Sequence, residues 1–129
     1  MSEEGGVPDP PQEEGWACGN GYAVALQGCT PPTVHRSMAR LELRPDGAFD
    51  YYTGSADMGN STDTTLVQIL AETMGIHTEQ IQIHAGDTAD GAFDTGTFAN
   101  ATTFVAGGAA VRAGKAMLER LVDETCLMT

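Results

Sequence analysis

The chain has 129 residues, a length that suits one domain, and 41% of them are hydrophobic. Its 18 acidic and 6 basic residues give a formal net charge of −12, which argues against a nucleic-acid or anionic-membrane surface because both need a basic face. No run approaches the roughly 20 apolar residues that span a bilayer, and the first residues lack the basic and apolar regions of a signal peptide. The expected compartment is therefore the cytoplasm.

Cysteine and histidine are sparse and scattered. No Cys-x-x-Cys occurs, and an odd number of cysteines at wide spacing predicts reduced thiols rather than a disulfide framework, a zinc site or an iron–sulfur site. We therefore predict no metal ligands in this chain. The residues concerned are Cys18, Cys29, Cys126, His35, His77 and His84.

The first part of the chain divides into a tail and a strand. Residues 1–15 are rich in proline, glycine and glutamate and are predicted to be a disordered tail, with residues 16–125 forming the domain. Tyr22, Val24 and Leu26 alternate with alanine, as in a buried strand, and consecutive prolines end the pattern.

A hairpin is predicted next. Leu41 and Leu43 alternate with charged residues from Met38 onward, which indicates a half-buried strand. Asp46-Gly47 is a strong hairpin-turn signal, and the aromatic-rich residues 48–53 are predicted to return as the partner strand.

A crossover follows the hairpin. Leu66, Ile69, Leu70 and Met74 form the apolar stripe of a helix that begins at Ser61 or Thr62 and ends before the cap Gly75. Residues 80–85 alternate again and predict a third sheet strand. The order strand, helix, strand favours a crossover onto one sheet.

A long loop and a second helix complete the pattern. The loop, residues 86–100, contains acids that we interpret as solvated turn residues because they lack the ligand spacing of a calcium loop: Asp87, Asp90 and Asp94. A helix of about 18 residues then places Phe104, Val111, Leu118 and Val122 on its apolar face, joined by Met117 and Leu121. Its glycine- and alanine-rich first half, residues 106–110, permits close packing on another backbone. The predicted fold is α/β (α+β), a small mixed sheet in the order β-ββ-α-β-α with two helices packed on it.

Two polar stretches lead directly into the two helices, residues 54–64 and 96–103. Helix N-termini present unpaired N–H groups and partial positive charge, so both ends could bind one anionic ligand where they converge at a sheet edge. Ordinary N-capping explains the same residue types, and the carboxylate of Asp63 could itself satisfy the first helix end.

The same stretches resemble a known family. The run from Asp57 to Thr64 with Leu66, Gln68 and Gly75, and the run from Gly86 through Asp94 to Phe104, resemble the molybdenum hydroxylases of the xanthine dehydrogenase and aldehyde oxidase family. The resemblance covers residues 19 to about 121, and its two long motifs stand in the family's order.

The resemblance implies a section of the molybdopterin-binding large subunit that shares its cofactor with segments outside the chain. The cofactor is molybdopterin carrying molybdenum, in one form as its cytosine dinucleotide, and the partners are the remaining large-subunit segments and iron–sulfur and FAD subunits or domains. The loop around Cys29 and Thr30 falls near the family's substrate channel. The implied cofactor-binding residues are Gly59, Asn60, Ser61, Thr62, Ala99, Asn100, Ala101, Thr102 and Thr103.

Some residues depart from the family pattern. Asn60 and Ser61 stand where Gln-Gly is common, and Asn100-Ala101 stands where Ser-Arg is common. The family's general-base glutamate lies in a later segment that nothing here matches, so the chain is not expected to turn over alone. The rival interpretations are a non-catalytic binding module that kept the fold and lost the cofactor, and a fragment with no independent role.

Overall fold

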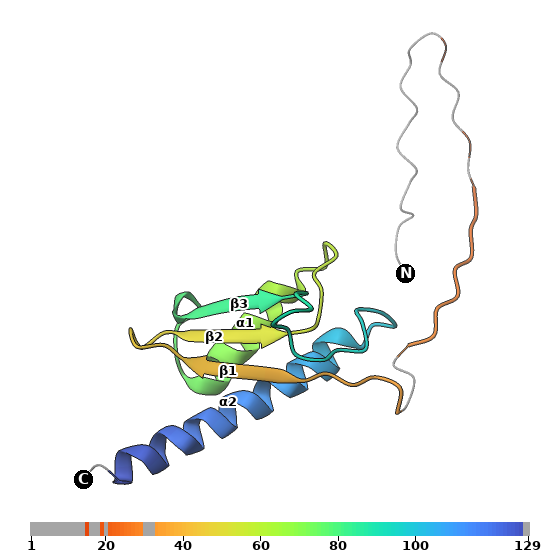
Figure 1. Cartoon of the computed structure of the whole chain (residues 1–129). Helices are drawn as coiled ribbons and strands as arrows, with labels where there is room; N and C mark the ends of the chain where they lie inside the picture. Colours follow the sequence, from red (N-terminus) through yellow and green to blue (C-terminus); the bar gives the residue numbers. More distant parts are fainter. Residues whose placement is uncertain (1–14, 16–18, 20, 30–32, 128–129) are drawn as a thin grey trace, which may run out of the picture.

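The computed structural model describes residues 15, 19, 21–29 and 33–127. A three-stranded sheet is covered by two helices on one face (Figure 1). The elements are β1 (Ala39–Leu43), β2 (Phe49–Thr53), α1 (Thr62–Met74), the short 3-10 helix η1 (Thr78–Gln80), β3 (Ile81–Ala85) and α2 (Thr102–Leu127). The mixed α/β class predicted above is confirmed. The predicted tail, residues 1–15, lies outside the described residues except for Gly15.

The predicted hairpin and crossover are both present. β1 pairs antiparallel with β2 in the register Leu41 to Tyr51, and Gly47 adopts the left-handed φ of 85° that the turn requires. β2 pairs parallel with β3 through the α1 crossover, which gives the strand order β1-β2-β3. Gly75 ends α1 in the left-handed conformation, with φ 68°.

The core lies between the sheet and the two helices. Leu66, Leu70 and Met74 of α1 pack beneath Phe49 and Tyr51 of β2. A side chain at Gly107 of α2 would meet Ile69, and one at Gly114 would meet Leu70. The glycines therefore allow α2 to pack closely on α1, as their cost in helix propensity suggested.

The second helix differs in length and packing face from the prediction. It has 26 residues, and its buried positions are alanines and glycines, namely Ala106, Gly107, Ala109, Ala110 and Gly114. Met117 and Leu121 pack against the core as predicted, whereas Phe104 and Val122 are 78% and 61% exposed and do not lie on the packing face. The stripe of small residues determines which face of α2 packs on α1, because small side chains let the two helix backbones approach each other.

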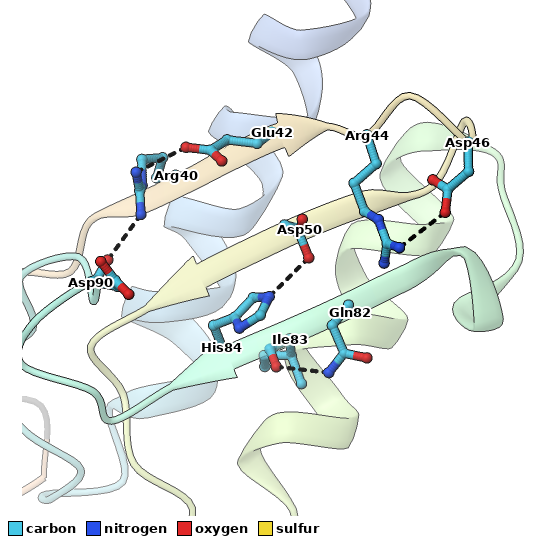
Figure 2. A network of polar contacts seen from close by, with 9 residues as sticks. All are labelled: Arg40, Glu42, Arg44, Asp46, Asp50, Gln82, Ile83, His84 and Asp90. Atoms are coloured by element: carbon cyan, nitrogen blue, oxygen red, sulfur yellow. Dashed lines mark hydrogen bonds and ion pairs between the residues drawn. The ribbon is translucent and has the colours of Figure 1, made fainter.

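The opposite face of the sheet carries an ordered polar network (Figure 2). Tyr52 lies between its register partners Arg40 and His84, with the guanidinium 3.9 Å from the ring centroid and the imidazole stacked at 4.6 Å. His84 Nε2 lies 2.8 Å from Asp50 Oδ1, and Arg40 pairs with Glu42 at 2.8 Å. This face of the sheet is therefore polar, and His84 lies on it.

The predicted strand at residues 22–27 is wrong. The segment forms no strand in the structure, and the side chains of Tyr22, Val24 and Leu26 are 99–100% exposed. The alternation of large and small side chains shows that one side of the segment could be buried in a sheet. Within the described residues, however, no strand pairs with it. No helix in the described part of the chain is long and apolar enough to cross a membrane.

Candidate functional site

The loops that precede the two helices meet at the C-terminal end of β2. Thr97 Oγ1 accepts a hydrogen bond from the Ala56 N–H at 3.2 Å and donates one to the Ala56 carbonyl at 2.8 Å. Ser55 Oγ donates to Asp94 Oδ2 at 2.8 Å, and Asp94 Oδ1 accepts from the Gly96 N–H at 2.7 Å. These contacts join two segments about forty residues apart in the sequence into one site.

Gly54 makes this junction possible. A Cβ at this position would overlap the Ala92 carbonyl oxygen and lie 2.8 Å from the Asp94 nitrogen. Because the obstructing atoms belong to the backbone, only glycine lets the second loop lie against the end of β2.

A polar strip leads from the core to the junction. Tyr51, Thr53 and Ser55 point toward the helices and are fully buried. Burial raises the pKa of the Tyr51 phenol to about 12, and the nearby Asp94 carboxylate acts in the same direction. The strip ends at Ser55, where its hydroxyl binds Asp94.

A cavity of about 370 Å³ lies where the two loops face each other. Among the described residues, its lining contains no charged side chain, and it combines amide, hydroxyl and apolar groups. The lining residues are Gln27, Met58, Asn60, Thr97, Phe98, Ala99, Asn100, Thr102 and Thr103. Its size and mixed lining are typical of small-molecule sites.

The N-terminus of α1 is closed by a carboxylate of the chain itself. Asp57 Oδ1 accepts from the Gly59 N–H at 2.8 Å, and Oδ2 accepts from the Asp63 N–H at 3.4 Å. Hydrogen bonds from the backbone, with that of Gly59 the largest, hold the pKa of Asp57 below its ordinary value. An anionic side chain therefore already occupies the position that an external anion would take.

Asp63 does not cap α1, contrary to the alternative raised from the sequence. Its Oδ1 is buried without a hydrogen-bond partner among the described residues. Burial, and then the neighbouring charge of Asp57, raise the pKa of Asp63. Ser61 makes no side-chain cap either, and it adopts the left-handed conformation with φ 57°.

The N-terminus of α2 is open. Ala99 and Asn100 both adopt left-handed φ, 54° and 53°, and Ala101 joins them to the first residue of the helix, Thr102. The first turn of α2 contains no acidic residue. Within the described residues, no side chain is hydrogen-bonded to the N–H groups of residues 102–104. This end thus keeps its donors and its partial positive charge beside the cavity.

The structure gathers some of the predicted site residues and separates others. Five line the cavity, namely Asn60, Ala99, Asn100, Thr102 and Thr103. Four do not contribute to its lining, namely Gly59, Ser61, Thr62 and Ala101. Cys29 lies next to the site, because its Sγ accepts a hydrogen bond from Asn100 Nδ2 at 3.2 Å, whereas Thr30 lies outside the described residues.

Asp94 is a turn acid as predicted, because Oδ1 accepts from the Gly96 N–H two residues on, but it is partly buried and not solvated. Its carboxylate is hydrogen-bonded to Ser55 and Gly96 and holds the second loop on the sheet. Asp57 and Thr97 were likewise not singled out from the sequence. The Asp-x-Gly spacing, present at Asp57 to Gly59 and at Asp94 to Gly96, is the signal that could have found both acids, because a carboxylate readily accepts from the N–H two residues on.

A family model described as a molybdopterin cofactor-binding domain matches residues 7–126. The chain belongs to this family. It corresponds to a section of the large subunit of molybdenum hydroxylases, so the resemblance seen in the two loop motifs is confirmed. Molybdenum-bearing molybdopterin is the cofactor of the family.

Individual relatives agree with this assignment. The chain is 30% identical over 112 residues to a probable hypoxanthine oxidase of Escherichia coli, and 32% identical over 89 residues to the nicotine 6-hydroxylase large subunit of Paenarthrobacter nicotinovorans. These alignments cover 87% and 69% of this chain but only 12% and 11% of the relatives. The chain therefore spans about an eighth of their length.

Solved structures share the fold. CO dehydrogenase from Oligotropha carboxidovorans matches with a TM-score of 0.63 and 27% identity over 66% of this chain and 11% of that one. Quinoline 2-oxidoreductase from Pseudomonas putida 86 matches with a TM-score of 0.60 and 29% identity over 69% of this chain and 11% of that one.

The two helix ends differ in how well they suit the family's anionic cofactor. The end of α2 suits it, since a helix N-terminus without an acidic residue in its first turn offers N–H donors and partial positive charge to an anion. The end of α1 does not suit a phosphate on its N–H groups, because the Asp57 carboxylate occupies them. Met58 and Asn60 are the residues of the first loop that line the shared cavity.

Proposed function

We propose that this chain supplies the part of a molybdenum hydroxylase that holds the anionic end of molybdopterin. The observation that carries the proposal is the uncharged cavity shared by both loops at the open N-terminus of α2. Residues 99–103 bind the pyrophosphate through backbone N–H and threonine hydroxyl groups. The loop at Gly59–Thr62 lies alongside, with Asn60 as its contacting side chain.

Two apolar residues of the cavity bear on how the rest of the cofactor is held. Met58 and Phe98 line the cavity, and both are exposed enough to offer apolar surface beside the N-terminus of α2. We propose that this surface contacts the planar part of the bound group, as apolar side chains do in most cofactor sites. A cytosine dinucleotide form is compatible with the open side of the cavity.

The intact enzyme is proposed to act on an N-heterocycle or an aldehyde. Relatives are named for hypoxanthine, nicotine and an aldehyde, and a structural neighbour for quinoline. In this family the bound cofactor supplies hydroxylation of a carbon atom with oxygen from water. The proposed partners are the remaining large-subunit segments and iron–sulfur and FAD subunits or domains, and Cys29 is proposed to lie near the substrate channel.

Co-expression tests the proposal. The chain is produced together with the flanking segments of a large subunit, and the purified complex is assayed for molybdenum and for pterin fluorescence. We expect both to be present at near-equal amounts. A well-folded complex that lacks both would overturn the proposal, as would oxidation of hypoxanthine by the isolated 129-residue chain with an artificial electron acceptor.

The second candidate is a non-catalytic module that kept the fold and lost the cofactor. The Asp57 carboxylate at α1 favours it, because it repels a phosphate from one of the two helix ends. The formal charge of −12 acts in the same direction. The same assay separates the two functions, because only the first predicts bound molybdopterin.

A further inference from the structure

One segment of the chain has the sequence of a strand and no partner. Residues 21–28 carry no charge, and their large side chains Tyr22, Val24 and Leu26 stand at alternate positions with nearly complete exposure. Figure 1 shows the segment leading away from the domain. An uncharged run whose large apolar side chains alternate with alanine is suited to strand addition.

The acceptor for such a strand is also present. β1 stands at the edge of the sheet, and no strand pairs with its outer side among the described residues. A groove of about 510 Å³ runs between this edge and α2. We call it the β1–α2 groove; its residues are Leu41, Glu42, Leu43, Met117, Arg120, Leu121 and Glu124.

The segment and the groove are complementary. In a strand added to β1, residues of one phase would face the helix side of the sheet, where Leu41, Leu43, Met117 and Leu121 offer apolar surface. Tyr22, Val24 and Leu26 have the side-chain spacing to fill that surface. The alanines between them would face the polar side with Arg40 and Glu42, where small residues cause no clash.

We propose that residues 22–27 of one chain add as a fourth strand to β1 of a second copy. The structure keeps the segment away from its own β1, since Gln27 lines the ligand cavity and Cys29 is bound by Asn100. Gly21 and Gly28 flank the segment, and a side chain at either would meet no atom within 4 Å. The segment is therefore surrounded by open space at both ends.

Exchange between two copies is reciprocal. Each copy gives one strand and receives one, so the pair is closed by two-fold symmetry and both exposed edges are covered at once. No charged side chain lies in the exchanged strand, whereas each chain carries a formal charge of −12. Added salt should therefore strengthen the pair by screening repulsion between the copies.

Sedimentation of the full chain over a range of concentrations tests this proposal with two matched variants. Val24→Lys places a charge in the phase that faces the groove, and Ala25→Lys places the same charge in the opposite phase. We expect a monomer–dimer equilibrium that Val24→Lys weakens at least roughly tenfold and Ala25→Lys changes by less than about twofold. Neither variant disturbs the fold, because both residues are exposed.

A mixing experiment tests the acceptor. Leu43→Lys alters the groove at a residue that is 48% exposed and should weaken pairing as Val24→Lys does. A mixture of the two variants should associate more tightly than either variant alone and less tightly than the parent, because one of its two junctions joins an intact strand to an intact groove. A chain that is monomeric at every concentration, equal effects of the two lysines at residues 24 and 25, or a mixture that associates no more than either variant alone would each overturn the proposal.

Discussion

The two helix N-termini of this domain look alike in sequence and differ in chemistry. Both follow a glycine-containing polar stretch, and both lie near one cavity. At α1 the carboxylate of Asp57 binds the N–H groups of Gly59 and Asp63. At α2 the left-handed pair Ala99 and Asn100 leads into a first turn without an acid.

A polar stretch before a helix is therefore not by itself an anion site. A helix N-terminus can bind an external anion only if no carboxylate of the chain itself is hydrogen-bonded to its N–H groups. An internal carboxylate and an external phosphate compete for the same donors and the same partial charge. The α1 end is therefore closed by the chain's own carboxylate, and the α2 end is available to a ligand.

The largest expected effect comes from the junction that brings the two ends together. In Gly54→Ala the added Cβ meets the backbone of Ala92 and Asp94, which cannot move without displacing the second loop. We expect a loss of about 3 kcal/mol in the free energy of unfolding, measured by urea denaturation. Gly28→Ala is the control, since a side chain there meets nothing within 4 Å, and an equal loss in both would contradict the account.

An acidic residue introduced at the N-terminus of α2 should stabilise the domain and prevent cofactor binding. Thr103→Glu puts an acid into the first turn of α2 beside the cavity, where it should stabilise the helix by about 0.3–1 kcal/mol. The same charge should remove molybdenum and pterin from the co-expressed complex. Thr103→Gln serves as the uncharged control and should keep the cofactor; loss in both variants would show that shape, and not charge, is responsible.

Removing the carboxylate at the N-terminus of α1 should change how the free energy of unfolding depends on pH below neutrality. The pKa of Asp57 is lowered in the fold, so its stabilising effect is present above its ordinary pKa of 3.8 and is lost as the pH falls through the folded value. Asp57→Asn should thus be less stable than the parent at pH 7, and the gap should close below about pH 3.8.

The pKa of Asp63 should also respond to the substitution Asp57→Asn. Its pKa is raised by burial and then by the charge of Asp57, so Asp57→Asn should bring it down toward its ordinary value. Carboxyl carbon NMR titration measures this shift directly. An unchanged Asp63 titration would mean that Asp57 does not lie at the helix end.

The smallest effect concerns the left-handed residue at the start of α1. Ser61 has φ 57°, a conformation that costs a non-glycine residue about 1–2 kcal/mol. After allowing for the greater freedom of glycine in the unfolded chain, Ser61→Gly should stabilise the domain by about 0.5 kcal/mol in thermal unfolding. Thr64→Gly, in the helix itself, should instead destabilise by about 0.3 kcal/mol.

The regular elements were predictable because their signals are local. The alternation at Leu41 and Leu43, the turn at Asp46-Gly47 and the stripe from Leu66 to Met74 each depend on neighbours within a few residues. These signals gave the hairpin, the crossover and the α/β class. The segment at residues 22–27 shows the limit, because alternation reports which side could be buried and not whether a partner strand is present.

The site was predictable in outline and not in its contacts. Both loops follow from polar residues before helical patterns, and the family resemblance named their ligand. The roles of Asp57 and Asp94 depend on left-handed turns and on two loops meeting across forty residues of chain, which no local pattern specifies. The packing face of α2 was misjudged for a related reason, since small residues carry little hydrophobic signal but set how closely helices pack.

The most direct test maps inorganic pyrophosphate onto the two ends. The full chain is titrated with pyrophosphate at low ionic strength, and the backbone amide shifts are followed by NMR. The account predicts saturable shifts at Ala99–Phe104 together with small shifts at Gly59–Thr64. Equal shifts at both ends, or larger shifts at the α1 end, would contradict the claim that Asp57 closes one helix and leaves the other to the ligand.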